Sequence, residues 1–247
     1  MKTALCLICH RPNDIWLKFL DKFVNYDVYV LIDDNTKTYS TEFKNLNVIQ
    51  VQNEDCKESG FCDVNFFMDK HIFIAGWDKA LYYFAVKNTN YKNIWFIEDD
   101  VFFANETTLV NIDNQYPVAD LLANTITSKT ENPTWPHWKL IENKINEPHY
   151  TAMCCASRVS SCLLQKIKEY ATTNKTLFFI EGLIPTICRQ NYLTSYSPSE
   201  LNTIYWRHSF LISTINTTQV YHPIKSIRTQ LAIRNLRCLP LQGVLMK

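Results

Sequence analysis

The sequence predicts an α/β fold in which a mixed, mainly parallel sheet is flanked by helices in a single domain. Two observations lead to this prediction: apolar runs of strand length alternate with segments of helical periodicity, and the turns between them are short. At 247 residues and 47% hydrophobic composition, the chain is long enough to bury one large core. We therefore expect one globular domain over residues 1–247.

The alternation is clearest in the first half of the chain, residues 1–103. Expected strands cover residues 3–9, 28–32, 48–51 and the run that ends at Glu98. Expected helices cover residues 14–24, with Asn13 or Asp14 as N-cap, and residues 71–88; a charged loop is expected over 53–63. This order favours parallel pairing, and ligands bind such sheets beyond the carboxyl ends of the strands.

The second half of the chain is more irregular and carries aromatic residues. Strands are expected over residues 118–127 and 153–157, with a proline-stiffened loop over 133–138 between them. Ser157 is expected to cap the next helix, and a further helix should start near Glu181 with Pro185 in its first turn.

Composition excludes several classes of protein. Only four glycines are present, so a glycine-rich phosphate loop is excluded, and a bound phosphate would need a metal or basic side chains. No apolar segment is long enough to span a bilayer, and the first apolar run is too short for a signal sequence, so we expect a cytoplasmic protein. Reduced thiols are then expected, although Cys56 and Cys62 flank a short loop and could form a local disulfide.

The charge is divided unevenly along the chain. The net charge is +1, but residues 201–247 contain six Lys and Arg residues and no acid, so the remainder carries −5. A basic segment on an acidic body can hold an anion, although it can also simply complement the acidic body. The neutral overall balance and the absence of a known motif argue against nucleic-acid binding.

Three consecutive acids, Glu98, Asp99 and Asp100, interrupt an apolar run. Buried carboxylates repel one another and lose hydration, so a cation is expected beside them. Alternation along an extended backbone would place Glu98 and Asp100 on one side, where they could share a divalent metal. A solvated acidic turn at the end of a strand is the alternative.

Other polar side chains are expected near these acids. Arg11 and the pair Asp33 and Asp34 follow two neighbouring strands, so they should lie at the same edge of the sheet. Glu181, between an apolar run and a helix, is either a helix N-terminal carboxylate or a positioned base. His222 lies close to a lysine in the acid-free segment and is either a ligand or an ordinary structural histidine.

Taken in order, these segments resemble the GT-A fold glycosyltransferases, which use nucleotide-sugar donors and have a Rossmann-like sheet. The resemblance is carried by residues 5–12, 29–34, 97–101, 179–186 and 221–225, with Glu98-Asp99-Asp100 as a form of the DxD signature. It implies that residues 1–103 bind the donor and residues 104–247 bind the acceptor. The short, asparagine-rich, glycine-poor chain also resembles viral or microbial members, which in a virus would act in the host cytoplasm.

The resemblance implies a metal site that holds Mn²⁺ or Mg²⁺. Asp100 would bind the ion directly, Glu98 would assist through water or contact the ribose, and Asp99 would face the protein or the donor sugar. His222 is the implied third ligand, and an imidazole suits Mn²⁺ better than Mg²⁺.

The implied donor is a nucleotide sugar, with UDP as the favoured nucleotide. Asp33 or Asp34 would meet the nucleotide base. Lys225, together with Arg11 or Arg228, would hold the phosphates as point charges.

The implied acceptor is a glycan, a glycoconjugate or another hydroxyl compound. Glu181 would be the base of an inverting transfer, whereas a retaining reaction needs no such base and remains open. Trp135 and Trp138 have faces suited to stacking on a sugar ring and, with His137, would contact the acceptor; burial at a domain seam is the alternative.

Two other functions fit the same residues. One is a sugar- or nucleotide-binding module without catalysis, which would not need Glu181. The other is a metal-dependent phosphoesterase or nucleotidyltransferase, although such sites commonly use two metals and the sequence has one tight acidic cluster.

Overall fold

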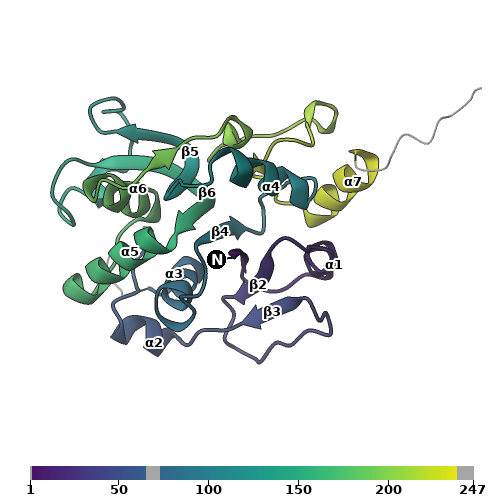
Figure 1. Ribbon diagram of the computed structural model, residues 1–247, viewed down its shortest axis with the longest axis horizontal. Helices are drawn as coiled ribbons and strands as arrows, with labels where there is room; N and C mark the ends of the chain where they lie inside the picture. The colour runs from purple at the N-terminus through teal and green to yellow at the C-terminus, as the bar shows by residue number, and fades with distance from the viewer. Residues whose placement is uncertain (1, 65–72, 238–247) are drawn as a thin grey trace, which may run out of the picture.

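The computed structural model of the chain describes residues 2–64 and 73–237 (Figure 1). Its central feature is a seven-stranded sheet with the strand order β3-β2-β1-β4-β6-β5-β7. Every pairing is parallel except those of β6, which runs antiparallel to both β4 and β5. The expected mixed, mainly parallel α/β sheet flanked by helices is therefore confirmed, and it joins strands from both halves of the chain.

The first half of the chain contributes four parallel strands. These are β1 (Thr3–Cys9), β2 (Asp27–Ile32), β3 (Leu46–Ile49) and β4 (Asn93–Glu98). The helices between them are α1 (Asp14–Leu20), α2 (Asn53–Glu58) and α3 (Gly76–Tyr82), and a π-helical turn over Tyr83–Lys87 continues α3. Cys9 pairs with Ile32 and Ile8 pairs with Glu98, so three strands end at one edge of the sheet.

The second half adds the antiparallel part of the sheet and its cover. The larger elements are α4 (Glu106–Gln115), β5 (Leu121–Ser128), β6 (Tyr150–Ser160), α5 (Ser161–Asn174), α6 (Ile180–Gln190) and α7 (Ile227–Arg237). Short strands are β7 (Ser195–Tyr196), β8 (Thr203–Ile204) and β9 (Tyr221–His222), and β8 pairs with β9 in a separate two-stranded sheet. Single 3₁₀ turns cover Trp138–Leu140, Ser199–Leu201 and Ile212–Thr214.

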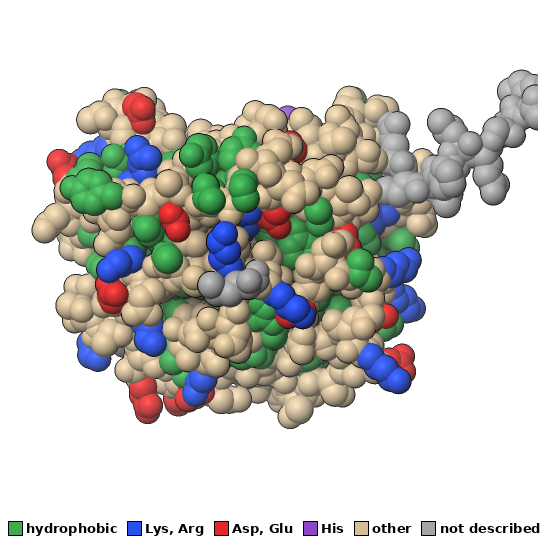
Figure 2. Space-filling view, in the orientation of Figure 1, with side chains coloured by type: hydrophobic (Ala, Val, Ile, Leu, Met, Phe, Trp, Pro, Cys, Tyr) green, Lys and Arg blue, Asp and Glu red, His purple; other side chains and the backbone are tan. Residues whose placement is uncertain are grey.

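The core lies on both faces of the sheet. Along β1, Cys6 and Ile8 pack with α3, α5 and α6 on one face, while Leu5 and Leu7 pack with α1 and α4 on the other. Burial on both faces explains why these strands are continuous apolar runs rather than alternating ones. Helix α7 lies beside α1, and basic side chains gather on the edge that these two helices form (Figures 1 and 2).

Several predicted boundaries in the first half are wrong. The expected loop over 53–63 begins with α2, whose first turn carries two acids that complement the helix dipole and whose Cys56 is buried in the core. Helix α1 ends at Leu20, and β3 lies two residues earlier than expected. The helix expected over residues 71–88 begins at Gly76, because the described residues 73–75 are not helical and Ala75 is extended; residues 71 and 72 lie outside the described residues.

Corrections in the second half concern one strand and two helix starts. Strand β6 is 11 residues long, so Ser157 lies inside it, and Ser160 caps α5 by accepting a hydrogen bond from the Leu163 amide. Arg158 does not end the strand, because its charged side chain is buried in an ion pair with Asp113. Pro185 lies beyond the first turn of α6.

The described cysteines are all free thiols, including Cys56 and Cys62, so the local disulfide is absent.

In the described parts of the chain, no helix is long and apolar enough to cross a membrane.

Candidate functional site

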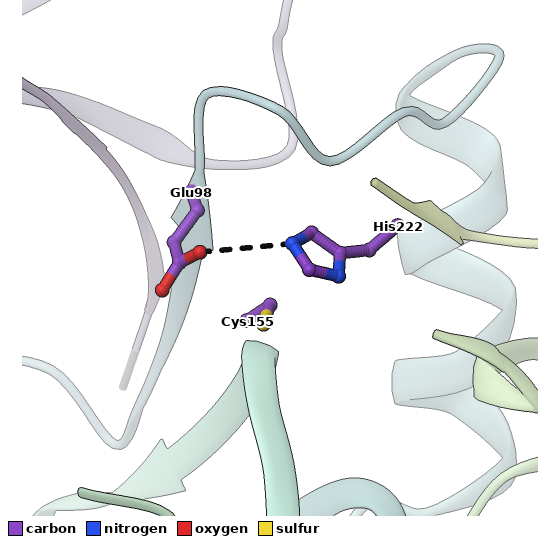
Figure 3. Close-up of side chains that lie close together, drawn as sticks. All are labelled: Glu98, Cys155 and His222. Atoms are coloured by element: carbon purple, nitrogen blue, oxygen red, sulfur yellow. Dashed lines mark ion pairs between the residues drawn. The ribbon is translucent and has the colours of Figure 1, made fainter. Parts of the chain in front are cut away.

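The acidic cluster lies where strand β4 ends. Glu98 is the last residue of β4, and Asp99 and Asp100 form the turn that follows. The turn is not extended, so alternation along a strand is the wrong argument for the side that Asp100 faces. Both Glu98 and Asp100 nevertheless face His222, whose Nε2 lies 3.9 Å from Glu98 Oε2 and 3.2 Å from Asp100 Oδ1 (Figure 3 draws Glu98 and His222).

Backbone pairing brings the late segment with His222 to these acids. Phe102 and Tyr221 exchange two backbone hydrogen bonds of 2.8 Å, and the Ile224 amide donates to Asp100 O at 2.7 Å. The acidic turn is also held from two helices, because Trp16 Nε1 and Gln230 Nε2 both donate to Asp99 O at 2.9 Å.

The imidazole of His222 is held in an orientation that suits a metal ligand. The side chain is buried, and its Nδ1 lies 2.6 Å from Tyr205 O. A proton on Nδ1 donated to this carbonyl leaves the lone pair of Nε2 facing the two carboxylates. Burial lowers the pKa of His222, but the Asp100 and Glu98 carboxylates outweigh burial and raise it overall. Metal binding here should therefore weaken as the pH falls.

Glu98 is oriented by a hydrogen bond from Trp77. The indole N–H of Trp77 donates to Glu98 Oε1 at 2.7 Å, which leaves Oε2 on the side of His222. Burial, followed by the charge of Asp100, raises the pKa of Glu98. Cys155 of β6 completes the surroundings: ligand atoms of Glu98, Cys155 and His222 all lie within 4.8 Å of one another (Figure 3).

These residues suit a divalent cation. When His222 is neutral with its proton on Nδ1, the buried Asp100 Oδ1 receives no hydrogen bond from Nε2, and a cation between the two atoms would satisfy both. Carboxylate oxygens beside an oriented imidazole nitrogen form a donor set that Mn²⁺, Zn²⁺ or Co²⁺ accepts readily, whereas Mg²⁺ prefers oxygen and water.

Glu181 stands in the first turn of α6, which packs on β6. Burial and the like charge of Glu98 raise the pKa of Glu181 from 4.5 to about 7. A carboxylate with this pKa can accept a proton near neutral pH.

Three of the side chains expected to bind the donor, Arg11, Asp33 and Asp34, already form ion pairs with other protein groups. Asp34 is buried and accepts hydrogen bonds from Thr36, from Tyr39 Oη at 2.6 Å and from Arg11 Nε at 2.7 Å. The hydrogen bonds from Thr36 and Tyr39 hold the pKa of Asp34 well below its usual range. Asp33 forms an ion pair of 2.7 Å with the buried Lys79.

The basic segment divides into exposed and buried members. Lys225 and Arg228 are exposed, and Lys225 lines a surface cavity of about 620 Å³ together with Arg207 and His208. Arg234 is buried and lies 3.8 Å above the ring centre of Phe19, so it packs in the core instead of meeting solvent.

The aromatic loop is split between core and cavity. Trp138 is only 4% exposed, and its indole N–H donates to a backbone carbonyl at 2.8 Å. Trp135 stacks on Phe179 with ring centres 5.9 Å apart, and His137 packs edge-on against the same ring. Trp135 and Trp206 line a cavity of about 360 Å³ beside β5, β6 and β8.

Sequence reasoning missed four of these residues. Cys155 and Trp77 lie in apolar surroundings, where such residues ordinarily only pack in the core. Tyr205 acts through its backbone carbonyl, which no sequence pattern reports. Of the four, only Trp206 could have been recognised from the sequence, because it is a large aromatic residue beside polar residues in an irregular segment.

No family model matches the sequence, and no curated protein matches it. Solved structures do match: the galactosyltransferase LgtC in complex with donor and acceptor sugar analogs has a TM-score of 0.53 and 11% identity, with 98% of each chain covered. An active-site mutant of LgtC gives a TM-score of 0.52 at 11% identity with the same coverage. The bifunctional glycosyltransferase WbbM in its apo form gives 0.45 at 13% identity, covering 95% of this chain and 44% of that chain. The similarity to LgtC extends over the whole chain, and the fold is therefore that of the GT-A glycosyltransferases.

Proposed function

We propose that this protein is a metal-dependent glycosyltransferase that moves a sugar from a nucleoside diphosphate sugar, with UDP favoured, to a glycan or other hydroxyl acceptor. The observation that carries the proposal is the meeting of Glu98, Asp100 and His222 at the carboxyl edge of a GT-A sheet. Ligands of such sheets bind at this edge.

Asp100 and His222 would hold a divalent cation, with Glu98 assisting and Mn²⁺ favoured over Mg²⁺. The bound ion would supply charge neutralisation for the departing diphosphate. Lys225 follows His222 closely on the exposed surface and would hold phosphate oxygens, and Arg228 and Arg11 are further candidates. Asp99, Asp33 and Asp34 remain candidates for donor contacts.

The transfer is proposed to invert the sugar. Glu181 would accept the proton of the attacking acceptor hydroxyl, and its pKa of about 7 places that proton transfer near neutral pH. Trp135, which lines the cavity, and His137, which packs against Phe179 at the start of α6, would contact the acceptor. The buried Trp138 would support this acceptor-binding surface from the side of the core.

The test is release of nucleoside diphosphate from a panel of nucleotide sugars in the presence of Mn²⁺. One nucleotide sugar should be consumed, slowly with water and faster with its acceptor, and Asp100→Asn should abolish the metal dependence. Glu181→Gln should lower transfer by at least about 100-fold. Binding without any turnover would instead support a non-catalytic module, and full transfer activity of Glu181→Gln would remove the base assignment.

Product stereochemistry separates the two transfer modes. Nuclear magnetic resonance of the first product formed should show inversion at the anomeric carbon. Retention would contradict the proposed role of Glu181 but would leave the metal site in place.

A further inference from the structure

A thiol lies inside the site, and the proposed sugar transfer gives it no task. Cys155 is 9% exposed, and its Sγ lies within 4.8 Å of ligand atoms of both Glu98 and His222 (Figure 3).

The position of this sulfur is set by the sheet. Ile97 pairs with Ala156 in the last pair of the β4–β6 ladder, so Cys155 lies one residue beyond that pair, next to the end of β4 at Glu98. The preceding residue of β6, Cys154, packs in the core cluster on the opposite face of the sheet, whereas Cys155 packs in the same cluster as its other neighbour, Ala156. The regular alternation of β6 is interrupted here by a shift in its pairing with β5, and the Cys155 sulfur lies beside Glu98 and His222.

The three groups differ in their preference for metals. Thiolate is a soft ligand that selects Zn²⁺ and similar ions, imidazole suits Zn²⁺ and Co²⁺, and carboxylate accepts nearly all divalent ions. Ligands of one zinc ion lie about 2.0 to 2.3 Å from it, so atoms within 4.8 Å of one another can reach a shared ion with small side-chain shifts.

We propose that Cys155 is a direct ligand of the cation at this site and gives the site a preference for Zn²⁺, Co²⁺ and Cd²⁺ over Mg²⁺. The inference rests on the proposed function only in placing a cation at Glu98, Asp100 and His222. When the ion binds, the thiol S–H bond breaks, a sulfur–metal bond forms and the proton passes to solvent.

The competing interpretation is that Cys155 only donates a hydrogen bond to the Glu98 carboxylate. Such a thiol would keep its proton when a cation binds to the oxygen and nitrogen ligands. The two interpretations therefore differ in one observable, a sulfur–metal bond.

Titration of the metal-free full chain with Co²⁺ tests this directly, without nucleotide. The wild-type protein should develop the near-ultraviolet absorption band of thiolate-to-cobalt charge transfer. Cys155→Ser should lose the band and bind Co²⁺ at least about tenfold more weakly, the scale on which even outer partners of metal ligands act. Its Mg²⁺ affinity should stay within about threefold, because Mg²⁺ takes oxygen ligands.

Two matched variants serve as controls. Cys154→Ser removes the neighbouring thiol of the same strand, and Cys162→Ser removes an exposed thiol that could bind cobalt adventitiously. Both should keep the band, whereas His222→Asn should weaken it together with Co²⁺ binding. Near-ultraviolet circular dichroism checks that Cys155→Ser folds, and Cys155→Ala provides a second substitution at the same position.

The inference is overturned if the wild-type protein shows no charge-transfer band, or if the band survives in Cys155→Ser and disappears in Cys162→Ser. Its failure is distinguishable from failure of the proposed function. A band that depends on Cys155 in a protein that consumes no nucleotide sugar would remove the transferase proposal alone. Turnover with Mn²⁺ in a protein without the band would remove only the sulfur ligand.

Discussion

Removal of the Glu181 charge should stabilise the metal-free protein at alkaline pH. The folded protein raises the pKa of this carboxyl from 4.5 to about 7, so the native state holds its proton more tightly than the unfolded chain. The free energy of unfolding therefore falls as the pH rises from about 4.5 to about 7. At about 1.4 kcal/mol per pKa unit, the charged carboxylate costs roughly 3 kcal/mol at pH 8.

Glu181→Gln keeps the size of the side chain and removes this cost. Urea unfolding with a chelator present should show the variant roughly 3 kcal/mol more stable than the wild type at about pH 8, and less than about 1 kcal/mol more stable at about pH 5. The matched control is Glu169→Gln: Glu169 forms an ion pair with Lys166 at the surface, and that pair lowers its pKa. The control should show no gain at alkaline pH.

The reasoning would be refuted by an equal stability of variant and wild type at both pH values, or by a gain that does not depend on pH. The first result would mean that Glu181 is well solvated, and the second that its packing rather than its charge limits stability. A gain in stability together with lost transfer would be the signature of a carboxylate held for catalysis.

Three further outcomes follow from other contacts. Arg158→Ala breaks the buried ion pair with Asp113, 2.6 Å long, and should lower the free energy of unfolding by about 3 to 5 kcal/mol in urea; a loss below about 1 kcal/mol would contradict it. Gly182→Ala places a Cβ 2.5 Å from Ile141 Cγ2 and should cost about 1 to 3 kcal/mol, with a smaller cost in an Ile141→Ala background. Trp206→Ala removes an exposed wall of the aromatic cavity and should raise the acceptor KM by roughly tenfold with little change in the donor KM, whereas equal changes in both would argue against an acceptor cavity there.

The sheet could be predicted because its strands are buried on both faces. Strand β1 and strand β4 therefore appear as unbroken apolar runs, and the acids at residues 98–100 mark the end of the second. Helix α2 was missed because a helix of six residues leaves little periodicity. The length of β6 was missed because Arg158 resembles a strand end until its buried partner is known.

The site was predicted in part. The meeting of His222 with Glu98 and Asp100 was expected only from a family resemblance, since the two segments are far apart in sequence. The ion pair of Arg11 with Asp34 agrees with the prediction that both lie at one edge of the sheet, whereas the ion pair of Asp33 with Lys79 could not be foreseen, because Lys79 comes from helix α3. Cys155 gave no signal, because a cysteine in an apolar strand has the same sequence surroundings whether it only packs in the core or lies beside the acids.

The pairing of Phe102 with Tyr221 has a consequence for assembly of the site. The acids emerge early in the chain and are covered by a segment that is synthesised near its end, so the site depends on a contact of long sequence separation. Closing such a long loop is entropically costly and slow compared with forming the local βα units. In a partly folded chain Glu98 and Asp100 would therefore lack His222, and the proposed cation site would be complete only when the late segment has packed against the acidic turn.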